Sequence, residues 1–191
     1  NIGELQIRGV EFTLNTELLN SEDFNWNVNF NATYLDREMT SLPLGRDQEV
    51  GGISGGTGAT IQIHREGFAP SSFYVYKQLY DTAGKPIEGG YADINGDGIV
   101  NASDRYIKDN GVPDVTLGFQ SSFTYKNLDF AFNLRASIGN YAYNNVYSST
   151  AQYSLLQDQS VLGNISTSTL DNGFRNTADV ISSDIYLENA S

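Results

Sequence analysis

Four segments of the chain alternate between apolar and polar residues, and this alternation most constrains the fold. The segments cover about residues 8–18, 24–34, 115–125 and 128–138. In the second segment every even position from Phe24 to Tyr34 is apolar, and the odd positions hold mainly Asn. Because successive side chains of a β-strand point to opposite faces, the pattern predicts strands with one apolar face and one polar face. We therefore predict an all-β fold.

The connections between these segments are very unequal in length. Residues 20–23 and 126–127 form short turns, whereas residues 35–114 and 139–191 form long connections. Short turns on one side and long loops on the other are typical of outer-membrane barrels, and tilted strands of roughly 9–11 residues cross the bilayer. Four strands cannot close a barrel. The sequence thus predicts antiparallel up-and-down strands forming part of a large transmembrane β-barrel, with 35–114 and 139–191 as long extracellular loops.

A different all-β reading fits the same alternation. One apolar face can pack on a core as readily as on lipid. The alternative is a secreted soluble β-domain with structural calcium that binds glycans or a protein partner. This alternative predicts a self-contained core and solubility without detergent. Within 35–114, residues 73–80 are expected to form a further strand or an ordered aromatic ridge.

Composition excludes several classes of function. The chain has 11 Lys and Arg against 23 Asp and Glu, a net charge of −12, and no Cys. Nucleic-acid binding requires clustered basic residues, so it is not expected. Disulfides and Cys-ligated metals are impossible. His64 is the one His and no G-x-S-x-G motif accompanies it, so we do not expect an enzyme.

Neither end of the sequence carries a start or stop signal. It begins at Asn1 without a signal peptide, and residues 184–191 contain no turn signal. We therefore expect an excerpt of a longer protein or a processed chain. No run of about 18 apolar residues is present, so no transmembrane helix is expected.

Residues 93–104 carry the sharpest chemical motif of the chain, D-x-N-x-D-G-x-V-N-x-x-D. Its oxygen donors fall at the spacing of a Ca²⁺-binding loop, and Gly98 stands where such a loop turns sharply. The last position is Asp rather than the usual Glu, so its shorter side chain offers weaker ligation. An acidic turn built on Asn-Gly and Asp-Gly is the plainer alternative. The predicted calcium ligands are Asp93, Asn95, Asp97, Ile99 through its carbonyl, Asn101 and Asp104.

Short motifs distributed along nearly the whole chain resemble the SusC/RagA family of TonB-dependent outer-membrane transporters. Individually these motifs are short, but they occur in the family's order. The matching stretches are N-I-G-E-L at 1–5, G-V-E-F at 9–12, E-G-F-A-P at 66–70, S-F-Y-V-Y at 72–76, the loop at 93–105, and G-F followed by F-x-Y-K-N-x-D within 118–129. Val75 stands where the family usually has Gly.

The resemblance implies a much larger protein, of which this chain is a C-terminal piece of the barrel. By this resemblance, the whole protein would be a barrel of about 22 strands with an N-terminal plug. Such a protein resides in the bacterial outer membrane and imports oligosaccharides or peptides. Its implied partners are TonB, which would act through a part not present here, a SusD-like surface lipoprotein that acts as a lid, and the lipid bilayer. The cargo and the residues that bind it remain unassigned.

Overall fold

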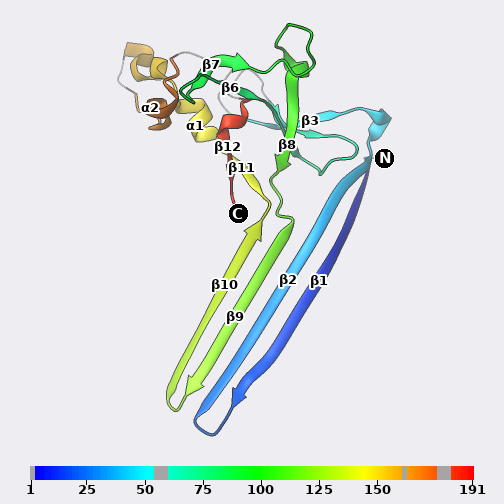
Figure 1. Cartoon of the computed structure of the whole chain (residues 1–191), viewed down its shortest axis with the longest axis vertical. Coiled ribbons are helices and arrows are strands. Elements are labelled where there is room, and N and C mark those ends of the chain that lie inside the picture. The colour runs from blue at the N-terminus through cyan, green and yellow to red at the C-terminus, as the bar shows by residue number, and fades with distance from the viewer. Residues whose placement is uncertain (1–2, 54–59, 161–162, 176–181) are drawn as a thin grey trace.

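The computed structural model describes residues 3–53, 60–160, 163–175 and 182–191. A long sheet forms one limb of the molecule, and the described residues within 42–114 and 139–191 form an outer region at one end of it (Figure 1). The two short turns lie at the opposite end of the long sheet. No helix among the described residues is long and apolar enough to cross a membrane.

The long sheet has the order β1-β2-β9-β10, and all its neighbours are antiparallel. Strands β9 and β10 coincide with the expected ranges, whereas β1 and β2 extend further. The reason is that backbone pairing continues as far as Glu4 opposite Ser41, although the apolar alternation ends near Tyr34. The strands are β1 (Glu4–Asn20), β2 (Phe24–Ser41), β9 (Val115–Tyr125) and β10 (Leu128–Ile138).

The strand register divides the long sheet into one apolar and one polar face. Residues opposite one another across the four strands share a face, so the sheet reads as rows. One apolar row is Leu14, Phe30, Phe119 and Leu134. The next row along is polar: Asn15, Asn29, Gln120 and Asn133.

Aromatic rings cover much of the apolar face. The rings of Phe123 and Phe130 lie 5.0 Å apart, and Phe119 and Phe132 lie 5.9 Å apart. The indole N–H of Trp26 donates to the hydroxyl of Ser121 at 2.9 Å. That bond pairs two polar groups that would otherwise lie unsatisfied among apolar side chains.

The outer region differs from the expected loops because most of segment 35–114 is folded. Four strands form an outer sheet of order β3-β4-β5-β8, and β6 and β7 form a hairpin. Further along, β11 pairs with β12. The elements are β3 (Gln48–Gly52), β4 (Thr60–His64), β5 (Ser72–Tyr76), β6 (Gln78–Tyr80), β7 (Pro86–Tyr91), β8 (Arg105–Asn110), β11 (Tyr141–Tyr143), α1 (Asn145–Thr150), α2 (Ser168–Asn172) and β12 (Leu187–Asn189), with 3-10 turns at Pro43–Gly45, Ala102–Asp104, Tyr153–Ser160 and Asp184–Tyr186.

Two small cores hold the outer region together. Ile61, Phe73 and Val75 are buried in one, and Ala151, Phe174 and Tyr186 in the other. Strand β5 is buried on both faces over most of its length. Such a strand shows no alternation, so residues 73–80 left open whether they form a strand or an ordered ridge. They form β5 and β6.

Backbone hydrogen bonds join the outer region to the long sheet. Leu35 N–H donates to the carbonyl of Asp114, and Asp114 N–H donates to that of Ile138. Met39 N–H donates to the carbonyl of Phe68. The C-terminal end of β2 is therefore bonded both to Asp114, just before β9, and to Phe68 of the outer region.

Candidate functional site: the outer loop and the two faces of the long sheet

The loop with the calcium motif connects β7 to β8 and lies far from the turns of the long sheet (Figure 1). Its first carboxylate, Asp93, accepts hydrogen bonds from Gly96 N–H at 2.7 Å and from Gly98 N–H at 2.8 Å. Gly96 and Gly98 both have positive φ, which glycine adopts without steric cost. The first half of the loop is therefore wrapped around the side chain of Asp93.

The middle of the loop repeats this side-chain-to-backbone bonding. Asn95 Oδ1 accepts from Asp97 N–H at 2.9 Å, and Asp97 Oδ1 accepts from Ile99 N–H at 2.8 Å. The carbonyl of Ile99 accepts from the side-chain amide of Asn101 at 3.1 Å. Each predicted ligand in this half thus has an oxygen engaged in holding the loop.

Asp104 closes the loop from a buried position. Its carboxylate accepts from the backbone N–H groups of Asn101 at 2.8 Å, Ile94 at 2.9 Å and Asn95 at 3.3 Å. The bond from Asn101 is the main cause that holds the pKa of Asp104 below its usual range. Asp104 and Asn101 also cap the 3-10 turn reciprocally. The buried carboxylate therefore links the two ends of the loop.

The predicted ligands belong to one loop, but their carboxylates do not form a ready-made cluster. Within the described ranges, no three His, Cys, Asp or Glu side chains are grouped closely enough to hold a metal ion. The carboxylates of Asp93, Asp97 and Asp104 are turned toward backbone N–H groups. The arrangement is thus a hydrogen-bonded loop with oxygen donors at calcium spacing.

Arg105 joins this loop to the outer sheet, a role that sequence reasoning did not identify. Its guanidinium donates to Glu49 and to the carbonyl of Thr60, and it lies 4.4 Å from the ring centroid of Tyr74. Arg65 lies over the same ring at 5.1 Å. Arg105, followed by Thr60, holds the pKa of Glu49 below its usual range. These partners are 31 to 56 positions away in sequence, so no local signal pointed to them.

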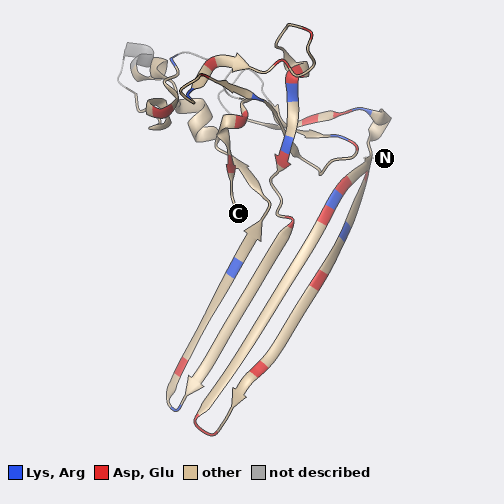
Figure 2. Ribbon diagram, in the orientation of Figure 1, with Lys and Arg blue, Asp and Glu red and all other residues tan. Residues whose placement is uncertain are grey.

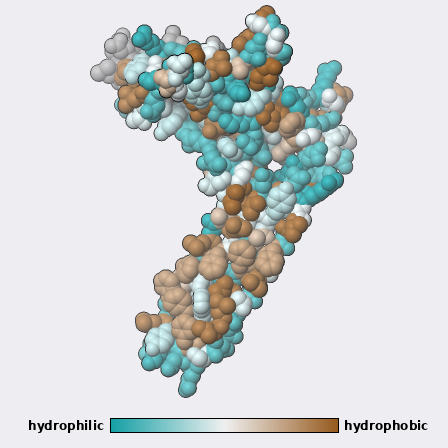
Figure 3. Space-filling view, viewed as in Figure 1, coloured by the Kyte–Doolittle hydropathy of each residue, from teal (hydrophilic) through white to brown (hydrophobic). Residues whose placement is uncertain are grey.

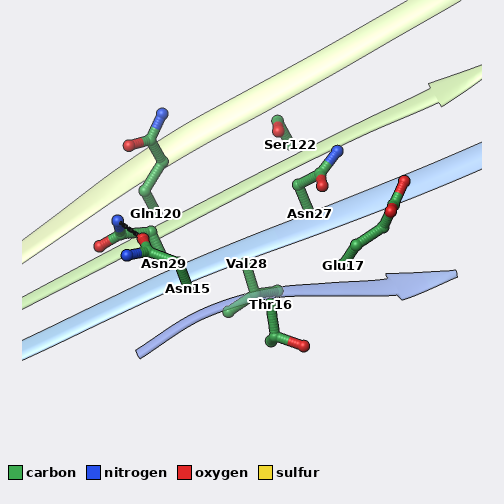
Figure 4. A pocket seen from close by; sticks show the side chains of 8 residues that line it. All are labelled: Asn15, Thr16, Glu17, Asn27, Val28, Asn29, Gln120 and Ser122. Carbon is green, nitrogen blue, oxygen red and sulfur yellow. Dashed lines mark hydrogen bonds between the residues drawn. The ribbon is translucent and has the colours of Figure 1, made fainter. Parts of the chain in front are cut away.

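The polar face of the long sheet is hollowed. One hollow of about 370 Å³ lies over β1, β2 and β9, where Asn29 donates to Asn15 (Figure 4). Carboxamide and hydroxyl groups dominate its lining, and Glu17 lies toward one end. Such a lining offers hydrogen-bond donors and acceptors together.

The opposite face exposes large apolar side chains. Val10, Leu128 and Leu134 are 69%, 72% and 60% exposed. Charged residues are sparse along β9 and β10 (Figure 2), and apolar atoms gather over the long strands in Figure 3. An apolar surface of this extent, on the far side of a polar face, is suited to contact with lipid.

Comparisons with known proteins agree with this arrangement. No family model matches the chain. It is 39% identical, over its whole length, to the TonB-dependent receptor SusC of Bacteroides thetaiotaomicron, and 35% identical, over 73% of its length, to the TonB-dependent receptor P3 of Formosa agariphila. Two solved structures of RagAB, one described as a peptide transporter and one as a peptide importer in a closed-closed state, match the whole chain with TM-scores of 0.65 and 0.67 at 19% and 20% identity.

The matches also show how much of the relatives is represented. The chain spans only 15% to 22% of each relative's length: 20% of SusC, 15% of P3 and 22% of the RagAB chains. The relatives are receptors and transporters rather than enzymes, which confirms the prediction made from the missing catalytic motifs. The fold prediction is confirmed in the same way, as an antiparallel segment of a larger barrel. The sequence identity to SusC, the RagAB fold and the two-faced sheet together place the chain in the SusC/RagA family of TonB-dependent receptors of the outer membrane.

Proposed function

We propose that this chain is a segment of a TonB-dependent outer-membrane nutrient importer that takes up oligosaccharides or peptides with a SusD-like surface lipoprotein. The observation that carries the proposal is the 39% identity to SusC over the whole chain. The two-faced long sheet supports it, because a barrel needs an apolar outside and a polar inside. On this proposal the outer region faces the cell exterior, where a lid and a cargo would meet it.

Import is tested in cells that carry the full-length receptor with its neighbouring lipoprotein. Uptake of labelled oligosaccharide mixtures and of labelled peptide mixtures is measured with and without functional TonB. We expect one of the two mixtures to enter only when receptor, lipoprotein and TonB are all present. Uptake that persists without TonB, or that never requires the receptor, contradicts the proposal.

We propose further that residues 93–104 bind one calcium ion that stabilises the outer region. Asp93, Asn95, Asp97, Asn101 and Asp104 would supply side-chain oxygens, and Ile99 its carbonyl. Hard oxygen donors at this spacing suit Ca²⁺. Carboxylate oxygens that accept one backbone N–H still have lone-pair capacity for a cation, so the hydrogen-bonded loop is compatible with binding.

Calcium removal is expected to loosen the loop between β7 and β8. At free calcium about 100 times its Kd, binding contributes about 2.7 kcal/mol, so local opening should be roughly 100-fold rarer. Proteolysis of the full-length receptor with calcium and with EGTA measures this difference. The double variant Asp93→Asn, Asp97→Asn should be cleaved quickly in both conditions.

Asp81 provides a matched control for the calcium variants. Its carboxylate accepts from Ala83 and Lys85 N–H in the neighbouring β6–β7 turn, but it lies outside the calcium motif. Asp81→Asn should keep the full response to EGTA. If wild-type cleavage is the same with and without calcium, the loop is an acidic turn and the calcium proposal is wrong.

A further inference from the structure

On the polar face of the long sheet, Gly118 stands between two larger residues, Asn31 and Arg135. The register places Thr13, Asn31, Gly118 and Arg135 in one row across the four strands. A Cβ at position 118 would lie 2.7 Å from the carboxamide of Asn31. The missing side chain of Gly118 therefore makes room for the carboxamide of Asn31, which lies in the same row as Arg135.

Gly118 and Arg135 both line a hollow of about 470 Å³. The polar groups that line it are carboxamides, hydroxyls and one guanidinium, and no carboxylate is among its lining residues. They are Asn29, Asn31, Thr116, Gln120, Asn133, Arg135 and Ser137. The hollow thus offers several hydrogen-bond donors around a single positive charge.

Arg135 has no partner of its own among the described residues, with neither a hydrogen bond nor an ion pair to its guanidinium. On its own strand, Asp129 is six residues away, roughly 20 Å along β10, and its carboxylate accepts from Thr124 at 2.7 Å. Glu11 and Glu17 lie on β1, three strand spacings or roughly 14 Å across the sheet. Asp114 lies beside Gly139, four residues or roughly 13 Å along the chain from Arg135. At about 13–14 Å in water each attraction is about 0.3 kcal/mol or less, so the charge of Arg135 is not neutralised within the sheet.

We propose that Arg135 and this hollow bind a carboxylate group inside the receptor. A guanidinium matches the two oxygens of a carboxylate in a bidentate pair. The side-chain amides of Asn31, in the same row, and of Asn133, two residues away on β10, add neutral donors. The carboxylate belongs either to cargo or to another part of the receptor, and the inference rests on the proposed function only in placing the polar face inside a barrel.

Chemical labelling of arginine tests this site in the full-length receptor. The purified receptor is treated with phenylglyoxal, and mass spectrometry follows modification of Arg135 and of Arg8. Arg8 is an exposed arginine of β1 on the apolar face of the sheet, opposite to the face that carries Arg135, and it serves as the internal control. The probes are N-acetyl-tetraalanine with a free carboxylate and the same peptide with an amide end.

We expect the peptide with a free carboxylate, but not its amide, to slow modification of Arg135 at least about fivefold and to leave Arg8 unchanged. This result assigns the carboxylate to cargo. If Arg135 is already protected in the receptor alone and 0.5 M NaCl restores its reactivity, the carboxylate belongs to the receptor. Equal reactivity of Arg135 and Arg8 under all conditions overturns the proposal. The proposal is also overturned if Arg135 is protected to the same extent with and without 0.5 M NaCl and with either peptide. Labelling does not depend on import, so failure of the transport proposal would be seen separately.

Discussion

Leu134→Arg is expected to destabilise the folded full-length receptor by about 2–4 kcal/mol, because it would place a charge on the lipid-facing side near the middle of β10. Leu134 is 60% exposed on the apolar face, in the row with Phe30 and Phe119. Asn133→Arg, one residue away at the same depth but on the polar face, should cost about 1 kcal/mol or less, since its charge can remain hydrated. Urea titration of the heat-shifted barrel band on a gel measures both variants.

The pair of variants tests whether the apolar face contacts lipid or water. On the surface of a soluble domain, an arginine at an exposed position changes stability by less than about 0.5 kcal/mol. Equal, small effects of Leu134→Arg and Asn133→Arg would therefore contradict a lipid contact for this face. A large effect at Asn133 alone would mean that the two faces have been assigned the wrong way round.

The long sheet was predictable because its information is local and repeated. Alternation over about 11 residues specifies a strand and both of its faces, and the turn at Lys126 and Asn127 specifies a hairpin. The motif at 93–104 is local as well, since all its oxygen donors lie within one loop, and its binding of calcium stays a prediction. The long connections between β2 and β9 and after β10 also followed from counting residues between the alternating segments.

The outer sheet was not predictable from the same signals. Its strands are five or six residues long, and β5 is buried on both faces, so they are too short for a clear periodicity. Its stability depends on partners far apart in sequence. Arg105 reaches Glu49, and Tyr106 reaches Asp184, 78 positions later. Such pairs become visible only when the chain is folded.

Asp184 is the anchor by which the last described segment holds the outer region. Its carboxylate accepts from Gln78 N–H at 3.0 Å and from the hydroxyl of Tyr106 at 2.7 Å, and Lys108 Nζ lies 3.8 Å away. Burial, followed by the bond to Asp184, raises the pKa of the Tyr106 hydroxyl, so the tyrosine stays protonated and continues to donate. Beside it, the buried hydroxyl of Ser183 donates to Gln78 Oε1 at 3.0 Å.

Asp184→Ala is expected to release this segment from β6 and β8. It leaves the N–H of buried Gln78 and the hydroxyl of half-buried Tyr106 without an acceptor. An unpaired buried donor costs about 1–3 kcal/mol, and a half-buried donor costs less. A combined loss of about 2–4 kcal/mol corresponds to a roughly 30- to 800-fold faster amide hydrogen exchange around Gln78. Glu188→Ala removes an exposed bond to Asn144 in the same segment and should change exchange less than about 10-fold. If the two variants exchange alike, the buried carboxylate of Asp184 contributes no more than a surface contact, and the cores around Val75 and Phe174 hold the outer region without it.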